Sequence, residues 1–297
     1  MLSQPPCVDP LKALLAFKSS SGGAGGIAAR TVASGAGWEV LDLLCTFGPS
    51  DRRFEEQHQS MSISVVLAGC FTYRSERGRE LLSPGSLLLG QASRLFECGH
   101  EHGDGDRCLS FQVAPWLFEE IGRDAGVWHS SFSSTHVPPL RYLAPLLARA
   151  RLLADGIGEA EELVLELVAA VQRHTIDAVD TPAVPVRDQR RIGPVLRLLA
   201  ERVEARHTLA DLARYAGLSR YHFLRTFKSV TGITPRQWLI RARLQRAAQL
   251  LRSGSTPVTE IAFEAGFEDL SNFIRTFRRE FGLSPSHYRN HRTRATP

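Results

Sequence analysis

The chain has 297 residues, of which 43% are apolar and 23% are charged. This length accommodates two domains, and this composition excludes a disordered, fibrous or collagen-like chain. The net charge of +5 is divided unevenly, because residues 187–297 carry 21 Lys or Arg against 9 Asp or Glu, a net +12, whereas the preceding residues carry a net −7. A basic half joined to an acidic half indicates that one half meets a polyanion, although charge alone would fit ordinary solvated surface groups equally well.

The cysteine content and the N-terminal segment bear on the cellular compartment. The five cysteines are odd in number and lie within the first 108 residues, which is not the arrangement of a disulfide framework. The apolar stretch from Leu11 to Phe17 is too short and too interrupted for a signal peptide or a membrane segment. We therefore expect a cytoplasmic protein with reduced thiols and no membrane partner.

The acidic half begins with a segment of low apolar content. Residues 1–36 include a run rich in Ser, Gly and Ala, from Ser19 to Gly26, and we expect a flexible N-terminal arm there. Between residues 37 and 138, short apolar or β-branched runs such as Ile63 to Ala68 alternate with turn clusters such as Ser83-Pro84-Gly85. Many short strands separated by turns predict a small β-barrel or sandwich.

Helical periodicity replaces this pattern after about Pro139. Leucine and valine recur at helical spacing through residues 139–176, which predicts two helices joined near residues 155–158. Residues 177–187 contain two prolines and few strong helix formers, as an extended linker does. A second domain is therefore expected from about Asp188.

The basic half contains an internal repeat at a shift of about 50 residues. In each copy a short helix, Leu209 to Tyr215 or Val258 to Glu264, runs into Ala-Gly, where glycine permits the positive φ of a tight turn. A second helix follows the turn in each copy. The recurring residues are Phe223, Arg225, Thr226, Phe227, Gly232, Pro235 and Trp238, matched by Phe273, Arg275, Thr276, Phe277, Gly282, Pro285 and Tyr288.

The second helix of each copy has two chemically different faces. Phe223 and Phe227 share one face at 100° per residue, as do Phe273 and Phe277, while polar and basic residues gather on the opposite face. This pattern predicts a helix-turn-helix whose second helix enters the major groove of DNA. A helical bundle with solvated arginines would explain one copy, but two matched copies favour DNA binding. The expected DNA contacts are Arg220, Tyr221, His222, Leu224, Arg225, Lys228, Ser271, Asn272, Arg275 and Arg278.

Two further helices are predicted around these units. The segment from Pro235 to Leu251 indicates one helix of about 25 Å. A rigid connector of that length would hold the two second helices near the spacing of about 34 Å between successive major-groove segments. A helix over about 188–203 would pack its apolar side against the first unit. One chain would then read two half-sites.

Several motifs of this block are shared with a known family. They are Gly217-Leu218-Ser219, Phe227-Lys228, Gly232-Ile233-Thr234-Pro235, Ile261-Ala262, Ala265-Gly266-Phe267 and the run from Phe277 to Pro285. With these motifs the segment from Asp188 to Asn290, roughly a third of the chain, resembles the DNA-binding domain of AraC/XylS transcription regulators. The resemblance implies RNA polymerase as a partner, activation as the mode of regulation, and base contacts mainly from Tyr221, Leu224 and Arg225, and from Ser271, Asn272 and Arg275. Leu224 departs from the polar residue that some members carry, so we expect apolar contact with a thymine methyl group there.

The same family commonly joins this domain to a cupin-type β-barrel followed by dimerising helices. The acidic half is similar in outline, with Pro84-Gly85 where such barrels have a Pro-x-Gly turn. The resemblance implies an α+β chain of two domains, a cupin-like β-barrel with a C-terminal helical pair and then an all-α domain with two helix-turn-helix units joined by a long helix. It also implies a homodimer and a small effector in the barrel, although the helical pair would equally well pack on its own barrel. The expected segments are an arm (1–36), a barrel (37–138), paired helices (139–176), a linker (177–187), the DNA-binding domain (188–290) and a basic tail (291–297).

The densest set of reactive side chains lies in the run from Phe96 to Phe111. Two thiolates and two imidazoles, from Cys98, His100, His102 and Cys108, suit zinc or another soft divalent cation. A metal-sensing or redox-sensing regulator is therefore an alternative interpretation. The spacing is not one of the common zinc arrangements, and a purely structural role stands beside it.

Two other classes of protein are less consistent with the sequence. Cupin metalloenzymes usually place His-x-His-x(3 or 4)-Glu before the Pro-x-Gly turn, whereas His100-x-His102 follows Pro84-Gly85 here, so we expect no enzyme. An architectural protein that binds DNA with little sequence preference would satisfy the charge. Such a protein would not need different sets of side chains on the exposed faces of its two second helices. The sequence thus predicts a sequence-specific transcription regulator, and the family resemblance implies that it is an activator that responds to a small effector.

Overall fold

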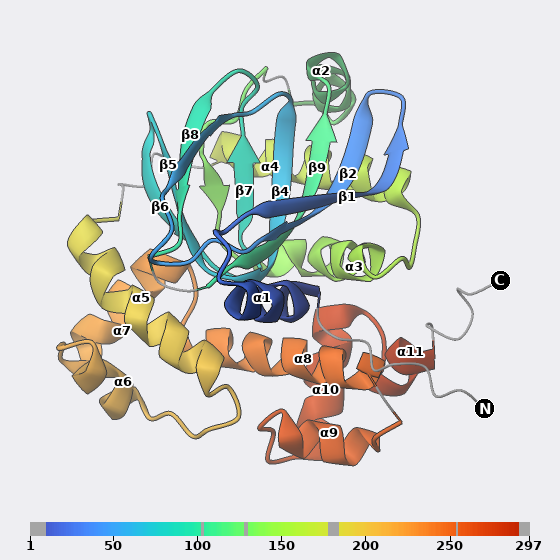
Figure 1. Cartoon of the computed structure of the whole chain (residues 1–297). Helices are drawn as coiled ribbons and strands as arrows, with labels where there is room; N and C mark the ends of the chain where they lie inside the picture. The colour runs from blue at the N-terminus through green and yellow to red at the C-terminus, as the bar shows by residue number, and fades with distance from the viewer. Residues whose placement is uncertain (1–9, 102–103, 128–129, 178–183, 254, 291–297) are drawn as a thin grey trace.

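The computed structural model describes residues 10–101, 104–127, 130–177, 184–253 and 255–290. The chain folds into a β-rich N-terminal half and a helical C-terminal half, which lie against each other with α1 (Pro10–Ser21) at their junction (Figure 1). This confirms the expected order of a β-sheet domain followed by a helical domain. The basic tail at 291–297 and most of the linker, residues 178–183, lie outside the described residues.

Two antiparallel sheets form the N-terminal half. The larger has the order β1-β2-β9-β4-β7-β10, and the smaller has the order β3-β8-β5-β6. The strands are β1 (Ile27–Gly35), β2 (Trp38–Cys45), β3 (Phe54–Gln57), β4 (Met61–Gly69), β5 (Phe71–Ser75), β6 (Gly78–Leu82), β7 (Leu87–Gly90), β8 (Leu95–Gly99), β9 (Asp106–Val113) and β10 (His136–Val137).

The expectation of a flexible arm over residues 1–36 differs from the structure. Residues 10–21 form α1, and β1 pairs along its whole length with β2 at the edge of the larger sheet. Most of β1 is exposed, and its apolar residues, mainly alanines, do not alternate with polar ones, so no strand pattern marked it in the sequence. A two-residue hairpin turn in which Gly37 has a φ of +79° connects it to β2.

Besides α1, four helical segments accompany the sheets in the part of the chain that the structure describes. Helices α3 (Ala144–Ala154) and α4 (Ala160–Asp177) are joined through residues 155–158 as expected, and a 3-10 turn (Arg141–Leu143) precedes them. Their apolar faces, with Leu147 and Leu163, join the same buried core as Ile63 and Leu109 of the larger sheet. The helical pair therefore packs on its own sheet. Helix α2 (Pro115–Asp124) was not expected from the sequence.

The C-terminal half consists of seven helices in the described residues. Each helix-turn-helix has its own core, and the long helix α8 contributes Trp238 to the first and Leu244 and Leu251 to the second. Among the described helices, none is long and apolar enough to cross a membrane. The helices are α5 (Val186–Glu201), α6 (Leu209–Tyr215), α7 (Arg220–Thr231), α8 (Pro235–Ser253), α9 (Val258–Glu264), α10 (Leu270–Phe281) and α11 (Pro285–Asn290).

Candidate DNA-binding interface and the cavity of the sheet domain

The two helix-turn-helix units are built from the same local signals. The hydroxyl oxygen of Ser219 accepts a hydrogen bond from the His222 amide, and the Asp269 carboxylate accepts bonds from the Ser271 and Asn272 amides of α10. These caps satisfy donors that a helix N-terminus leaves free. Gly232 and Gly282 end the two helices with φ values of +74° and +73°, which a glycine adopts without strain. The repeat in sequence is therefore a repeat in structure.

Buried aromatic rings fix the orientation of the second helix of each unit, α7 in the first and α10 in the second, which we call the recognition helices. Phe223 and Phe227 are fully buried with ring centroids 5.6 Å apart, and Phe273 and Phe277 are fully buried with centroids 5.5 Å apart. Because these rings occupy one face of each helix, the residues on the opposite face must point away from the core. The packing of the phenylalanines thus determines which side chains are free to meet DNA.

The predicted DNA-contacting side chains lie on the outer faces of α7 and α10. Eight of the ten are exposed, and among the residues that the structure describes Tyr221 is the most exposed of the large hydrophobic side chains, at 78%. His222 and Asn272 are half-buried, and the Asn272 side-chain oxygen accepts a hydrogen bond of 3.2 Å from the Arg275 guanidinium. The eight exposed residues are Arg220, Tyr221, Leu224, Arg225, Lys228, Ser271, Arg275 and Arg278.

One outward-facing apolar residue was left out of the expected contacts. Ile274 is 38% exposed on α10, and its equivalent fifty positions earlier, Leu224, is 36% exposed on α7. The shift of the repeat would have pointed to this pair, because Ile274 occupies in the second unit the place that Leu224 occupies in the first. Both recognition helices therefore present an apolar group beside an arginine.

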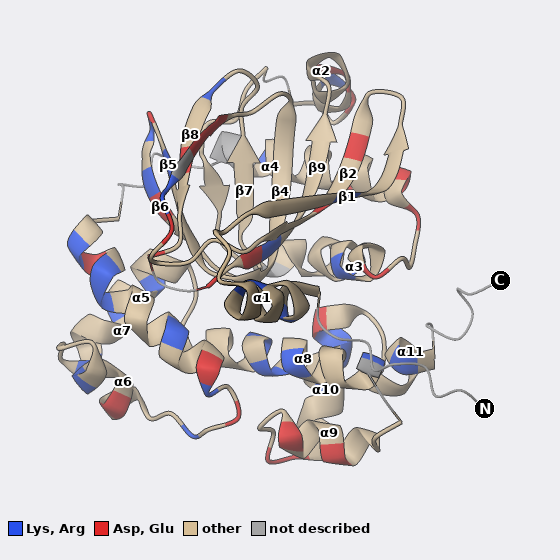
Figure 2. Ribbon diagram, in the orientation of Figure 1, with Lys and Arg blue, Asp and Glu red and all other residues tan. Residues whose placement is uncertain are grey.

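Basic side chains are numerous in the helical half, as the charge count predicts. Figure 2 shows Lys and Arg along α5 and α8 and acidic residues on α9. The arginine of each reading face is exposed, and a guanidinium can present a planar fork to guanine or phosphate. Exposed acidic residues such as Glu260 and Glu264 lie on the first helix of the second unit, away from its recognition helix in sequence.

A cavity of about 250 Å³ lies within the N-terminal half, lined from both sheets. Its wall carries the serine hydroxyls of Ser62, Ser64 and Ser110 and the imidazole of His58. The His58 Nε2 lies 2.9 Å from the Tyr73 hydroxyl, and burial lowers the pKa of this imidazole to about 4. The cavity is therefore polar but uncharged around His58 at neutral pH, a lining suited to a small organic molecule.

The structure gives the residues expected to hold a metal different neighbours from those predicted. Cys98 and Cys108 are buried, and burial with the neighbouring Asp106 carboxylate raises the pKa of both thiols. His100 is buried as well, but its Nε2 lies beside Cys45 Sγ (3.4 Å) and Asp106 Oδ1 (2.6 Å). His102 lies outside the described residues. The four-residue set therefore stays a prediction.

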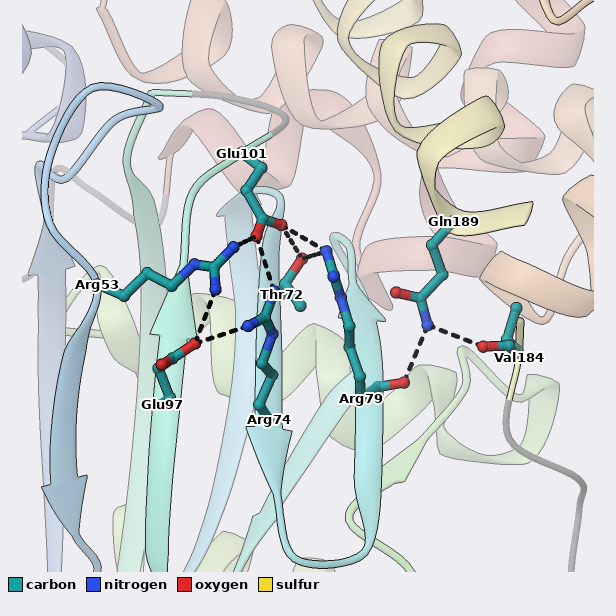
Figure 3. Close-up of polar contacts among 8 residues, drawn as sticks. All are labelled: Arg53, Thr72, Arg74, Arg79, Glu97, Glu101, Val184 and Gln189. Carbon is teal, nitrogen blue, oxygen red and sulfur yellow. Dashed lines mark hydrogen bonds and ion pairs between the residues drawn. The ribbon is translucent and has the colours of Figure 1, made fainter. Parts of the chain in front are cut away.

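Polar contacts connect the outer face of the small sheet to the helical half. Glu101 accepts hydrogen bonds from Arg74 (3.0 Å), Arg79 (2.6 Å) and Arg53 (Figure 3). The fully buried Gln189 of α5 donates from Nε2 to the Arg79 carbonyl oxygen at 2.9 Å. Strand β6, which carries Arg79, thus contacts the first helix of the DNA-binding half.

A second set of contacts joins α3 to the second helix-turn-helix. The Glu280 carboxylate of α10 lies 3.4 Å from the Arg151 guanidinium and 3.7 Å from that of Arg241. The Tyr288 hydroxyl donates to Asp155 Oδ2 at 3.2 Å. Since Arg151 and Asp155 belong to the sheet domain, both helix-turn-helix units contact the N-terminal half.

Comparison with known proteins identifies the chain. A family model described as a helix-turn-helix domain matches residues 212–291. The transcriptional activator RhaS of Escherichia fergusonii is 30% identical over 253 residues, 84% of this chain and 77% of that protein. The thermoregulatory protein LcrF of Yersinia pestis is 41% identical over 210 residues, 69% of this chain and 69% of that protein. A solved structure of the AdpA DNA-binding domain with a target DNA is 33% identical over 36% of this chain and 98% of that one, with a TM-score of 0.34. On its relatives, its β-rich N-terminal half and its paired helix-turn-helix units, the chain belongs to the AraC/XylS family of DNA-binding transcriptional regulators, not to a family of enzymes.

Proposed function

We propose that this regulator reads promoter DNA with both recognition helices and activates transcription when a small effector occupies the cavity of its sheet domain. The observation that carries the first part is the pair of equivalent exposed faces on α7 and α10, each with an arginine in register. Each face is fixed by buried phenylalanines and is not covered by the sheet domain. Two such faces on one chain would read two half-sites.

Individual roles follow from side-chain chemistry. Arg225 and Arg275 would make bidentate contacts with guanine, and Ser271 would donate to or accept from a base edge. Leu224 and Ile274 would contact thymine methyl groups, because both are exposed and apolar. Tyr221 and Asn272 would also contact bases, as the family resemblance implies. The remaining members of the predicted set would bind the phosphate backbone or flanking bases: Arg220, His222, Lys228 and Arg278.

The effector would bind between the two sheets, which we take to form the cupin-like barrel of the family. A volume of about 250 Å³ with serine hydroxyls and a neutral histidine in its wall supports a small molecule with several hydrogen-bonding groups. Activation would be exerted on RNA polymerase by a cytoplasmic homodimer, as the family resemblance implies. Leu165, 40% exposed on α4, marks a helix face available for pairing.

A contiguous set of contacts would carry the signal from the cavity to DNA. Strand β9 forms part of the cavity wall, and its Arg107 points to the other side, where it donates to Asp42 (2.9 Å) and to the Ala154 carbonyl oxygen (3.4 Å). The next residue, Asp155, forms an ion pair with Arg252 of α8. A shift of β9 would therefore be transmitted to the end of α3 and from there to the DNA-binding half.

Selection of genomic DNA fragments by the purified full-length protein, at a fixed salt concentration, tests the proposal. We expect enrichment of a site with two half-sites about one helical turn apart. On that site, Arg225→Ala or Arg275→Ala should each cost about 1 to 3 kcal/mol and relax base preference in one half-site only.

The matched control is Arg187→Ala, which removes an exposed arginine of α5 far in sequence from both recognition helices. This variant should lower binding to cognate and random DNA alike, and only slightly. Equal losses on cognate and random DNA for Arg225→Ala and Arg275→Ala would contradict the assignment of base reading and leave phosphate contact alone.

A further inference from the structure

Three buried side chains from separate places in the sequence converge at one edge of the cavity. Cys45 ends β2, Asp106 begins β9 directly opposite it in the sheet, and His100 follows β8 of the other sheet. Their donor atoms, Sγ, a carboxylate oxygen and a ring nitrogen, all lie within 4.8 Å of one another, and all three residues are buried. Among the described residues, this is the group whose His, Cys and acidic donors gather this closely.

We propose that Cys45, His100 and Asp106 form a mononuclear site for a thiophilic divalent cation of the Zn²⁺ class. One thiolate, one imidazole and one carboxylate are ligands that zinc accepts together, and three protein ligands leave a fourth position open. The two anionic ligands would balance the charge of the cation, which is what a buried site requires. This set shares only His100 with the ligands expected from the sequence.

The observed distances are close to those of a tetrahedral site. Bonds of about 2.3 Å to sulfur and about 2.0 Å to nitrogen, at a tetrahedral angle, place these two atoms about 3.5 Å apart. Cys45 Sγ and His100 Nε2 are 3.4 Å apart. His100 Nε2 and Asp106 Oδ1 are 2.6 Å apart, the length of a hydrogen bond, and would separate by about 0.7 Å when a cation replaces the shared proton.

Neighbouring groups hold the ligands in place. The rings of Phe47 and Phe71 are both stacked near the His100 ring, with centroid distances of 6.2 and 6.0 Å, and restrict its rotation. The Cys108 thiol lies 3.4 Å from Asp106 Oδ2 and donates to it. Such contacts around a metal ligand set its orientation and contribute to affinity. The arrangement is therefore organised before any cation binds.

The open position would face the cavity, because Cys45, His100 and Asp106 all line it. A water molecule or a small ligand with an oxygen or nitrogen donor would complete the coordination there. Only the regulatory use of the site rests on the proposed function: Asp106 precedes Arg107, whose contacts with Asp42 lead toward the DNA-binding half. Binding of the cation itself does not depend on DNA recognition.

Titration of the full-length protein with Co²⁺, after reduction and removal of metal by a chelator, tests the site. We expect one equivalent to bind with a thiolate-to-cobalt charge-transfer band and the intense visible bands of four-coordinate cobalt, and Zn²⁺ to displace it. Cys45→Ser should abolish the charge-transfer band. Asp106→Asn should keep this band but weaken binding by about tenfold to a hundredfold or more.

The matched control is Cys70→Ser, which removes another buried free thiol outside the set and should leave the spectrum unchanged. Far-UV circular dichroism and DNA binding of each variant separate loss of the ligand from loss of the fold. The proposal is overturned if no equivalent of Co²⁺ binds, or if the band survives in Cys45→Ser and disappears in Cys98→Ser or Cys108→Ser. A spectrum as expected with DNA binding indifferent to Zn²⁺ would support the site and refute only its regulatory use.

Discussion

The two glycines that end the recognition helices provide a matched pair of substitutions. Gly232 and Gly282 have the same backbone conformation, so alanine at either position should cost about 1 kcal/mol of backbone strain. Their surroundings differ, because a Cβ at Gly282 would meet no atom within 4 Å, whereas a Cβ at Gly232 would lie 2.3 Å from Pro138 Cβ. Carbon atoms in contact are about 3.5 Å apart or more, so the first helix-turn-helix and the sheet domain would have to separate by roughly 1.2 Å.

The separation should destabilise the junction of the two halves specifically. Overpacking of this kind costs about 1 to 3 kcal/mol, and it would stretch the hydrogen bond from Gln189 to the Arg79 carbonyl oxygen. We therefore expect Gly232→Ala to cost about 2 to 4 kcal/mol in total, against about 1 kcal/mol for Gly282→Ala.

Amide hydrogen exchange followed by mass spectrometry would measure this difference locally. Gly232→Ala should accelerate exchange in β6 and α5, which meet at the junction, by about tenfold or more, since each 1.4 kcal/mol is a factor of ten. Gly282→Ala should leave exchange in β6 and α5 unchanged. Equal exchange in the two variants would refute the reasoning, because it would mean that Pro138 yields without moving the halves apart.

Three further predictions concern the packing and charge of the molecule. Glu280→Gln would leave the buried Arg151 guanidinium without its carboxylate and should lower the free energy of unfolding by about 2 to 3 kcal/mol. In a double-mutant cycle, adding Arg151→Met to the same chain should restore a part of that free energy. Phe227→Ala and Phe277→Ala each remove a fully buried ring and should cost about 3 to 5 kcal/mol, with faster amide exchange in the first or the second unit respectively. Burial raises the pKa of Glu80 from 4.5 to about 7, so the folded carboxyl keeps a proton that the unfolded one loses, and its contribution to stability should fall as pH rises from 4.5 to 7. Glu80→Gln should remove that fall, which thermal unfolding at pH 5 and pH 8 would show.

The helix-turn-helix units were predictable because their signals are local. A glycine turn, a capping Ser219 and aromatic residues at helical spacing lie within one segment. The repeat contains the same pattern a second time and so supports the prediction independently. The bounds expected for the first helix of each unit, Leu209–Tyr215 and Val258–Glu264, agree with the structure. By contrast, β1 is an exposed edge strand, whose pairing with β2 rather than its own composition defines it.

The cluster at the edge of the cavity was not predictable, because it depends on strand register. Cys45 lies 55 residues before His100, and only the pairing of β2 with β9 places it opposite Asp106. Sequence proximity pointed instead to Cys98 and Cys108, which share the same short run as His100. A slip of one residue in the pairing of these strands would turn Cys45 to the other face of the sheet. No pattern within a single segment of the sequence shows which register the strands adopt.

The position of α8 limits how an effector could act on DNA binding. Its first half is buried in the core of the first unit, with Trp238, and its second half in the core of the second, with Leu251. Because one continuous helix belongs to both cores, the spacing of the two reading faces should be fixed. The sheet domain contacts α8 through Arg252, α5 through Gln189 and α10 through Glu280. A signal from the cavity would therefore move the two helix-turn-helix units as one body. We therefore expect the preferred separation of half-sites to be the same with and without effector, while the affinities for the two half-sites change together. Selection from libraries of DNA sites with spacers of different length would measure this separation. A separation that changes with effector would contradict a rigid α8.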